Sequence, residues 1–440
     1  MSRRKAIAWL YGEFAELNAA GILSVEIIEQ LRAHYGPVSI RSKRSTALLL
    51  FSILGAASIG LGIILLLAHN WNTLGRPIRT VLSFMPLMAG QALVWWTLLC
   101  RSRSTPWREG SGVFLALAVG ACISLISQTY HIKGDMSTFL LTWIILGGPL
   151  VYVLNATAVA LFYLAGITCW AAAVQFEHSQ ALLFWPLAAF LAPHIWQAFK
   201  NNPEGPRVQL LSWGLCVALP FATGFVLERT MPGLWLVVYS GLFCTLLLAG
   251  RGPFRAVRLN AFHLAGFLGV AVMTLILTYD GVWRDIGWNH YRHGAGYHAW
   301  LIWQDYAMAL ASLAGVIILA VQTVRRKDWL AAAAIGLPAL AVLGFTASAQ
   351  DVPAGIMVGA FNLYALILGA VIVVMGLQRD ELITVNAGMA LISMLIILRF
   401  FDADLTFTIR GLLFIVLGIG FLCANVAMVR RAATRKEAES

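Results

Sequence analysis

Long apolar runs alternate with short polar links along most of the chain. Each run has about 17–25 residues, the length that an α-helix needs to cross roughly 30 Å of hydrocarbon. The runs lie near residues 45–69, 78–100, 111–130, 137–154, 156–174, 181–199, 208–228, 233–249, 257–279, 300–324, 329–349, 354–376, 382–400 and 407–429. The pattern predicts an all-α fold, a polytopic bundle of about 14 transmembrane helices. The divisions around Gly148 and Asn155 are the least marked, because one kinked helix would give the same pattern as two.

Composition also indicates a membrane protein. Of the 440 residues 60% are hydrophobic and only 12% are charged, and the mean hydropathy of +0.79 lies far above that of a soluble globular chain. The chain begins MSRRK and lacks there the short apolar segment of a cleavable signal peptide. The first apolar run is therefore expected to direct membrane insertion.

Basic residues are distributed unevenly over the predicted links. If the N-terminus is cytoplasmic, 23 of the 31 lysines and arginines fall on the cytoplasmic side and 8 on the outer side, as the positive-inside rule requires. Losing or adding one span would disturb this alternation from that point onward. The sequence therefore predicts that both termini are cytoplasmic. The net charge of +11 follows from the same sorting, so membrane lipids rather than nucleic acid are the expected partners.

Residues 4–35 have the pattern of a helical hairpin that precedes the first span. Apolar residues recur at steps of three and four, Gly21 suits the end of a first helix, and Ser24 suits the start of a second. The expected division of the chain is a cytoplasmic hairpin at residues 1–44, a transmembrane bundle at 45–429 and a basic cytoplasmic tail at 430–440. A cap that lies on the membrane and a docking module for a soluble partner are both consistent with the hairpin.

The centre of the predicted bundle lacks charged residues. No Asp, Glu, Lys or Arg falls near the middle of any span, and the nearest ionisable side chains, His194 and His263, lie towards cytoplasmic ends. Ion- and proton-coupled carriers usually need such groups at mid-membrane, so this class is disfavoured. The cysteines show no ligand spacing, and the three histidines of the outer loop at 280–299 are read as part of an aromatic loop at headgroup level. The sequence therefore predicts no cofactor and no metal centre.

Polar side chains gather instead at the predicted outer face. The turn QTYHIKGD, residues 128–135, joins the third and fourth spans, and RFFDADLTFTIR, residues 399–410, joins the last two. The candidate substrate-binding residues are Gln128, Tyr130, His131, Asp135, Arg399, Asp402 and Arg410. Arginine at such a position can bind phosphate or carboxylate through two hydrogen bonds. We predict that the two groups lie within contact range. The competing interpretation is a helix cap in the first segment and a charge-balanced turn in the second.

Several segments resemble a known family. They include AWLYGEFAELNAAGILSVEIIEQLRAHYG, GIILLLAHNWNTLGRPIR and SLISQTYHIKGDMSTFLLTWIILGGPLVYVLNA, within about residues 8–170. This part of the chain resembles an uncharacterised family of bacterial polytopic inner-membrane proteins that contain a domain of unknown function. The resemblance implies a bacterial inner-membrane location, a cytoplasmic hairpin and an outer turn of the form Gln-x-Tyr-His-x-x-Gly-Asp. Some relatives are encoded beside a single-span protein with a large outer domain, which implies such a partner here.

Three functions fit these features. The first is a transporter or flippase of a lipid-linked or otherwise amphipathic envelope molecule, because many spans with short links suit a path through the membrane. The second is a membrane-embedded transferase that uses a lipid-linked donor at the outer face, where Arg and His side chains would bind diphosphate and activate a hydroxyl. The third is a scaffold or sensor of an envelope complex. The sequence favours transport and leaves open whether the protein is an enzyme.

Overall fold

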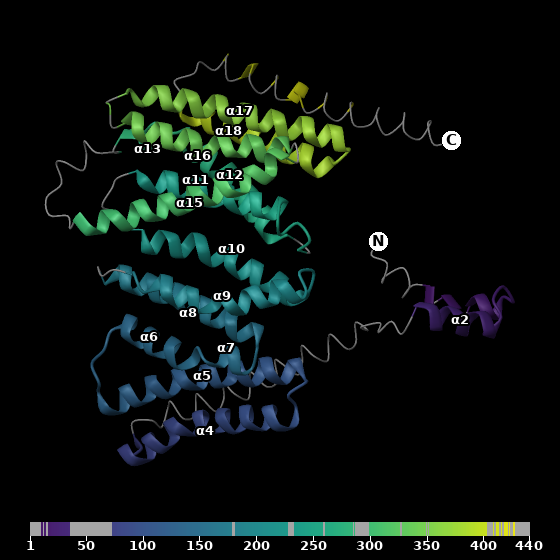
Figure 1. Cartoon of the computed structure of the whole chain (residues 1–440), viewed down its shortest axis with the longest axis vertical. Coiled ribbons are helices and arrows are strands. Elements are labelled where there is room, and N and C mark those ends of the chain that lie inside the picture. Colours follow the sequence, from purple (N-terminus) through teal and green to yellow (C-terminus); the bar gives the residue numbers. More distant parts are fainter. Residues whose placement is uncertain are drawn as a thin grey trace. The chain divides into compact units, whose positions relative to one another are not determined.

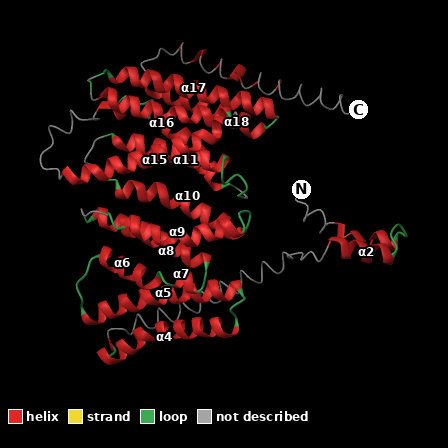
Figure 2. Ribbon diagram, in the orientation of Figure 1, coloured by secondary structure: helices red, strands yellow, loops and turns green. Residues whose placement is uncertain are grey.

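The protein is all-helical, without strands, in the part of the chain that the structure describes (Figures 1 and 2). This computed structural model describes residues 10–35 (without 12 and 15), 73–177, 181–227, 233–257, 260–284, 286, 299–325, 328–348, 350, 352–402 and a few residues between 408 and 426. The chain forms two compact units, Met1–Arg79 and Thr80–Ser440. The predicted all-α class is confirmed.

Long helices follow one another with short connections. They are α2 (Val25–Tyr35), α4 (Arg76–Cys100), α5 (Thr105–Tyr130), α6 (Met136–Gly147), α7 (Leu150–Val153), α8 (Thr157–Phe176), α9 (Phe184–Asn201), α10 (Pro206–Val226), α11 (Leu234–Arg251), α12 (Ala261–Ile276), α13 (Gly281–Arg284), α15 (Ala299–Arg325), α16 (Trp329–Ser348), α17 (Ala354–Arg379) and α18 (Leu382–Asp402). Ten segments of the described chain are long and apolar enough to cross a membrane: α4, α5, α6 with α7, α8, α10, α11, α15, α16, α17 and α18.

Two further predicted spans form helices that fall short of this measure. In α9 the polar residues His194, Gln197 and Lys200 interrupt the apolar run. Helix α12 is apolar but has only 16 residues. The predicted first span and most of the predicted last span lie outside the described residues, as does most of the outer loop at 280–299. The structure therefore confirms a multi-pass helical bundle, with ten candidate spans in its described part.

Helix α2 in the unit Met1–Arg79 begins where the sequence predicts the second helix of the hairpin. The Ser24 hydroxyl accepts a hydrogen bond from the backbone N–H of Ile27 at 3.4 Å, which is an N-cap contact. Gly21 has a φ of 70°, a left-handed conformation that glycine adopts readily at the end of a helix. Phe14 and Ile28 are buried within the unit. The first helix of the hairpin includes residues outside the described part.

The structure separates the two predicted spans on either side of Asn155. Helix α6 ends at Gly147, and Pro149, which has no N–H to donate, leads into the single turn α7. Asn155 follows with a φ of 48°, a left-handed conformation that cannot continue an α-helix. Helix α8 then begins at Thr157 and packs against α5 and α6. These segments are therefore two elements rather than one kinked helix.

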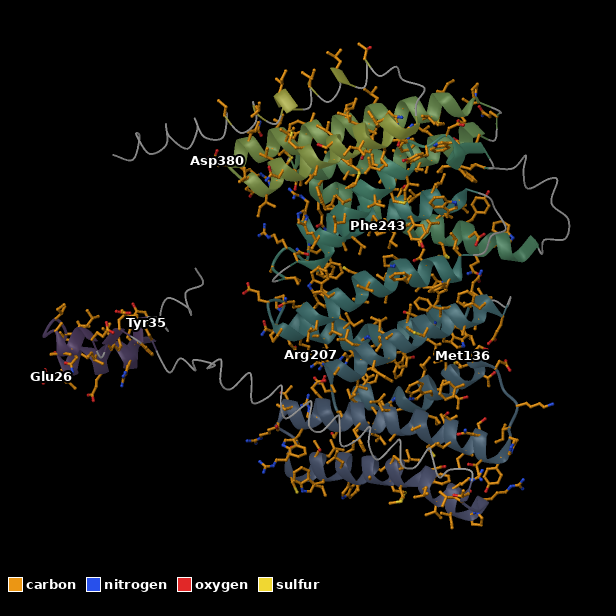
Figure 3. All side chains as sticks on the ribbon, turned by 180° about the vertical axis from the view of Figure 1, so that it is seen from behind. Glu26, Tyr35, Met136, Arg207, Phe243 and Asp380 are labelled. Atoms are coloured by element: carbon orange, nitrogen blue, oxygen red, sulfur yellow. The ribbon has the colours of Figure 1, made fainter. Side chains whose placement is uncertain are left out.

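The helices of Thr80–Ser440 stack roughly in the order of the sequence, from α4 and α5 to α17 and α18 (Figure 1). Successive connections alternate between the two ends of the helices. Figure 3 labels Arg207 and Asp380 at one end and Met136 at the other, and we call these the Arg207 end and the Met136 end. Helix α11 lies in the interior, packed against α10, α12, α15 and α16. Many large apolar side chains on the outer helices are exposed, as expected for a surface that faces lipid.

Glycine allows α11 and α12 to approach closely. A Cβ atom added at Gly266 would lie 2.2 Å from the backbone nitrogen of Leu247, and one added at Gly250 would lie 2.4 Å from that of His263. Both contacts are with backbone atoms, which cannot move aside as a flexible side chain can. The pair is thus packed through small residues, as is common between transmembrane helices.

Candidate functional site

The QTYHIKGD turn is an exposed helix end in the structure. Helix α5 stops at Tyr130, and His131 takes a left-handed conformation with a φ of 53° while its N–H bonds the carbonyl oxygen of Ser127. Gln128, Tyr130 and His131 are exposed, whereas Thr129 is buried and bonds the Leu125 carbonyl oxygen at 2.7 Å. The competing interpretation of this segment as a helix cap therefore describes its backbone well.

The remaining contacts of this turn are local or reach a neighbouring helix. The Tyr130 hydroxyl lies 2.9 Å from the hydroxyl oxygen of Thr80 on α4. Asp135 occupies the N-cap position of α6, and its carboxylate accepts a hydrogen bond from the Thr138 hydroxyl at 3.3 Å. These contacts connect α4, α5 and α6 at the Met136 end.

The second predicted group lies elsewhere in the same unit. Arg399 on α18 donates to the hydroxyl oxygen of Thr278 at 3.4 Å, and its guanidinium lies 4.7 Å from the centre of the Tyr279 ring. Asp402 is the last residue of α18, but its side chain and the whole of Arg410 lie outside the described part.

The structure does not bring Tyr130 and Arg399 together. Helix α5 packs against α6, α7 and α8, whereas α18 packs against α17, at the other extreme of the stack of helices (Figure 1). The prediction of contact range is wrong for this pair. The charge alternation fixes which end of the helices a residue occupies, but not its lateral position within the bundle. A role for the seven predicted residues in substrate binding stays a prediction.

A more connected polar group lies at the Arg207 end. It comprises Arg108, Glu109, Asn155, His194 and Arg207, and we call it the Arg108–Arg207 cluster. Its members come from the first turn of α5, the link before α8, the second half of α9 and the first turn of α10. The sequence pattern drew attention to His194 only for its position and to Asn155 only as a link between spans, and it did not group these five residues as a site.

Glu109 caps helix α8 from a neighbouring helix. Its two carboxylate oxygens accept hydrogen bonds from the backbone N–H groups of Thr157 at 2.7 Å and Ala158 at 2.6 Å. The first N–H groups of a helix have no partner within the helix, and they carry a partial positive charge. The carboxylate satisfies two of these donors, so Glu109 is held in place and the start of α8 is stabilised.

Asn155 is the residue that both arginines bind. Arg108 donates from Nη2 to its backbone carbonyl oxygen at 2.8 Å, and Arg207 donates from Nη2 to its side-chain Oδ1. The left-handed conformation of Asn155 presents these two oxygens to different helices. The link between α7 and α8 is thus held by cations from α5 and α10.

His194 extends the cluster into α9. Its ring is 2% exposed, and Nε2 lies 2.8 Å from Arg207 Nη2. Because an arginine only donates hydrogen bonds, Nε2 must accept, which identifies the neutral imidazole with its proton on Nδ1. His194 therefore adds no charge, and the cluster holds two cations and one anion.

A second polar pair lies at the same end of the helices. Arg251, the last residue of α11, binds both carboxylate oxygens of Asp328 through Nε at 2.6 Å and Nη2 at 2.8 Å. Asp328 precedes α16 and accepts from the backbone N–H of Ala331. Burial favours the neutral form of this carboxyl, but the hydrogen bonds and the charge of Arg251 outweigh it and lower the pKa of Asp328 below its ordinary value.

A groove lies between α9, α10, α11 and α15, and we call it the seam groove. Its volume is about 570 Å³. The lining residues are Leu182, Trp185, Leu219, Thr223, Val238, Leu242, Thr245, Gln304, Ala307, Met308, Ala311 and Ser312. Gln304 donates from Nε2 to the Val226 carbonyl oxygen at 2.7 Å, while its Oε1 is buried and has no hydrogen-bond partner in the described chain. The groove is therefore apolar with a polar acceptor near the Met136 end.

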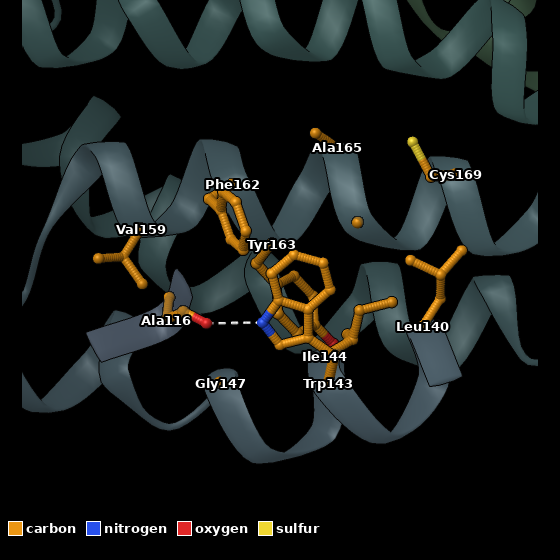
Figure 4. Close-up of a pocket in the computed structure, with 11 residues that line it drawn as sticks. Ala116, Leu140, Trp143, Ile144, Gly147, Val159, Phe162, Tyr163, Ala165 and Cys169 are labelled. Carbon is orange, nitrogen blue, oxygen red and sulfur yellow. Dashed lines mark hydrogen bonds between the residues drawn. The ribbon is translucent and has the colours of Figure 1, made fainter. Parts of the chain in front are cut away.

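A smaller cavity of about 170 Å³ lies between α5, α6 and α8 (Figure 4). Its lining is apolar apart from the hydroxyl of Tyr163 and the thiol of Cys169. The indole Nε1 of Trp143 donates to the Ala116 carbonyl oxygen at 2.6 Å, the bond drawn in Figure 4. This bond holds the ring beside Gly120, where an added Cβ would lie 2.4 Å from it. We read this cavity as a feature of helix packing.

The fold and these sites define a multi-pass helical membrane protein. Residues 15–160 match the family model described as Predicted membrane protein (DUF2157), a domain of unknown function. The match confirms the resemblance to an uncharacterised membrane family and covers less than half of the chain. It includes Arg108, Glu109 and Asn155, but not His194 or Arg207. No curated protein and no solved structure matches the chain.

Proposed function

We propose that the protein is a bacterial inner-membrane transporter or flippase that moves a lipid-linked or other amphipathic envelope molecule. In this proposal the chain has 14 spans, both termini are cytoplasmic and residues 4–35 form a cytoplasmic hairpin. The Arg207 end of the helices then faces the cytoplasm, in agreement with the excess of basic residues in the connections at that end.

The seam groove is the observation that carries this proposal. Its volume falls in the range of about 300–1,000 Å³ that is usual for ligand sites. It lies along α10, α11 and α15, all of which are candidate spans, so it is at the depth of the hydrocarbon. Because lipid tails are as apolar as leucine, a hydrocarbon chain would exchange between the bilayer and this groove with little change in free energy.

The polar residues of the groove suit the other part of an amphipathic molecule. Gln304 lies near the start of α15, at the Met136 end, and its Oε1 offers a buried acceptor to a hydroxyl or amide donor. Thr245 and Ser312 lie deeper, and their side-chain hydroxyls already donate to backbone carbonyl oxygens. A bound amphipathic molecule would place its polar head near Gln304, and its apolar tail would contact the apolar lining towards the middle of α15.

The groove lies between α10 and two helices that follow it in the chain, α11 and α15. Helix α10 also contacts α12. Near the Arg207 end, Phe199 of α9 packs with Phe254 and Phe262, at ring-centre distances of 4.9 and 6.2 Å. Near the Met136 end, the Gln304 side chain of α15 donates a hydrogen bond to the Val226 carbonyl oxygen at the end of α10. A small rotation about the aromatic contacts would widen or close the groove, which is a motion that transport requires.

The direct test is to measure lipid occupancy and lipid movement with the groove filled. Ala311→Trp places a large ring in the groove, and Leu310→Trp places the same ring on the exposed side of α15. Purified protein is reconstituted with a phospholipid or a polyprenyl phosphate that carries a diazirine in its tail. We expect crosslinks at the groove residues of the wild type and of Leu310→Trp, and their loss in Ala311→Trp.

The same proteoliposomes report movement when they contain a fluorescent phospholipid or a fluorescent polyprenyl phosphate that is quenched from outside. Ala311→Trp should lower the rate of flipping by at least about tenfold, which corresponds to a rise of about 1.4 kcal/mol in the barrier. Equal crosslinking of the two tryptophan variants would show that the groove is not the binding site. No flipping of either probe above protein-free vesicles would contradict the proposed transport.

A further inference from the structure

We infer that the Arg108–Arg207 cluster is a binding site for a phosphate group, carried by an anionic lipid or by free phosphate. This inference is separate from the proposed transport, because the cluster lies at the opposite end of the helices from Gln304 of the seam groove. It follows from the charge of the cluster, its buried donors and its position.

The cluster has an excess of positive charge. Arg108 and Arg207 both bind Asn155, so the two guanidinium groups lie on either side of one residue. The anion that the hydrogen bonds place among them is Glu109, and both of its oxygens are already bound by the first N–H groups of α8. The start of a helix is itself partly positive. One carboxylate thus faces two cations and a helix N-terminus. A bound anion would neutralise the excess positive charge.

The cluster also has hydrogen-bonding atoms to spare. The Nε atoms of Arg108 and Arg207 are buried and have no hydrogen-bond partner in the described part of the chain. The same is true of the hydroxyl of Ser111, which is 2% exposed and lies one helical turn along α5 from Arg108. Buried donors without a partner are costly, and in proteins a bound ligand or an ordered water usually satisfies them.

Phosphate is the anion that fits this arrangement best. It offers several acceptor oxygens in a tetrahedron, so the Nε–H of Arg108, the Nε–H of Arg207 and the Ser111 hydroxyl can each donate to an oxygen. A carboxylate offers only two oxygens, one for each Nε–H, and leaves none for the Ser111 hydroxyl. Three donors, two on α5 and one on α10, therefore match phosphate better than they match a carboxylate.

The position of the cluster agrees with such a ligand. Arg108 and Arg207 lie in the first turns of α5 and α10, two candidate spans, and so at the level where the chain leaves the hydrocarbon. Phosphate groups of anionic lipids lie at this level, and basic pockets between transmembrane helices bind them. Free phosphate would reach the same level from water.

The experiment uses the full chain in a maltoside detergent, which contains no phosphate. Binding is measured by titration calorimetry with inorganic phosphate in one arm and with phosphatidylglycerol in mixed micelles in the other. We expect saturable binding in at least one arm. Arg207→Gln should weaken it by about tenfold or more, as expected for the loss of hydrogen bonds to a charged group. Arg103→Gln, an exposed arginine at the same end, should leave it unchanged.

A second variant separates loss of binding from loss of folding. Glu109→Gln removes the negative charge of the cluster but keeps an oxygen that can accept a hydrogen bond from α8. It should tighten phosphate binding severalfold, the opposite of the effect of Arg207→Gln. Binding in the phosphate arm identifies free phosphate as a ligand, and binding in the phosphatidylglycerol arm alone identifies the lipid. Absence of binding in both arms overturns the inference. Binding that Arg103→Gln weakens, and that neither Arg207→Gln nor Glu109→Gln alters, overturns it too.

Discussion

At the scale of single residues, the most informative side chains are charged groups that bridge elements distant in the sequence. Arg251 and Asp328 are 77 positions apart and form a two-point ion pair that is only partly exposed, at 15% and 19%. Partial burial strengthens such a pair relative to one in open water, because fewer water molecules compete for its hydrogen bonds. The lowered pKa of Asp328 reports this interaction.

Asp328→Asn tests the ion pair through the pH dependence of stability. A carboxyl whose pKa is lowered by folding stabilises the protein above its ordinary pKa of about 3.9, and this contribution is lost as the pH falls through the lowered value. At pH 7 the variant should lose about 1–3 kcal/mol of stability, while its amide keeps the N-cap bond to α16. Thermal unfolding in detergent at pH 7 and at pH 3 measures the effect.

The difference between wild type and Asp328→Asn should shrink at the acid pH, because the stabilisation that comes from a lowered pKa declines as the pH falls below the ordinary pKa of the carboxyl. Glu204→Gln, an exposed carboxylate at the same end of the helices, serves as the control and should change little at either pH. A difference that stays constant between the two pH values would mean that the charge of Asp328 does not stabilise the fold.

Sequence patterns located polar residues at helix ends but not their partners. Gln128 and His131 were predicted as binding residues because they follow an apolar run, and that position is also where a helix cap is expected. Arg108 and Asn155 are 47 positions apart, and no periodicity connects them. Their contact depends on the bend at Pro149 and the left-handed turn at Asn155, which are tertiary features. The one signal in the sequence that could have indicated this cluster is the pair Arg108-Glu109 near the start of α5.

At the scale of helices, hydrophobic periodicity and length predicted most of the described elements. The runs near 354–376 and 382–400 became α17 and α18 with nearly the predicted bounds. The run near 181–199 became α9, but its second half carries polar residues because it contributes His194 to the cluster. In α9, the departure from the apolar pattern at His194 therefore belongs to the polar cluster.

Gly266→Ala tests the close approach of α11 and α12. The added methyl group would overlap the backbone of Leu247, so the helices must separate, and the cost is expected to be about 1–3 kcal/mol. Gly359→Ala on α17 is the matched control, because an added Cβ there meets no atom within 4 Å. That change should be neutral or stabilising by up to about 1 kcal/mol. Thermal midpoints in detergent compare the two, and an equal loss in both would show that the contact at Gly266 is unimportant.

Glu109→Ala tests the cap that α5 provides for α8. Loss of two hydrogen bonds from helix N–H groups to a carboxylate should cost about 1–2 kcal/mol. Amide hydrogen exchange should become faster in the first turn of α8, at Thr157 and Ala158, and stay unchanged in the middle of α17. Mass spectrometry of peptides from each region would resolve this, with Glu204→Ala as the control. Unchanged exchange at the start of α8 would contradict a capping role.

At the scale of the unit Thr80–Ser440, the alternation of connections is the feature that the charge pattern predicted best. Arg207 and Asp380 lie at one end and Met136 at the other, as the assignment of basic links to one side requires (Figure 3). The neighbours of each helix within the bundle could not be predicted in this way. They depend on complementary surfaces such as the glycines between α11 and α12.

Cysteine labelling tests whether successive connections between the helices lie on opposite sides of the membrane. In a chain without its six native cysteines, Ser102→Cys and Asn202→Cys place a thiol at the Arg207 end, and Lys133→Cys places one at the Met136 end. All three positions are exposed. On intact spheroplasts, a membrane-impermeant maleimide should label Lys133→Cys at once and the other two only after permeabilisation. Labelling of Ser102→Cys and Lys133→Cys from the same side would contradict the topology.

The left-handed residues His131, Asn155 and Asp380 allow stability and side-chain function to be distinguished. Glycine adopts this conformation without the steric cost of a Cβ, which is about 1 kcal/mol or more. Selection for a stable backbone alone would therefore favour glycine at all three positions. At Asn155 that exchange would also remove the amide that Arg207 binds. Among natural variants, we expect glycine to replace His131 or Asp380 freely, and to replace Asn155 only where Arg207 has also changed.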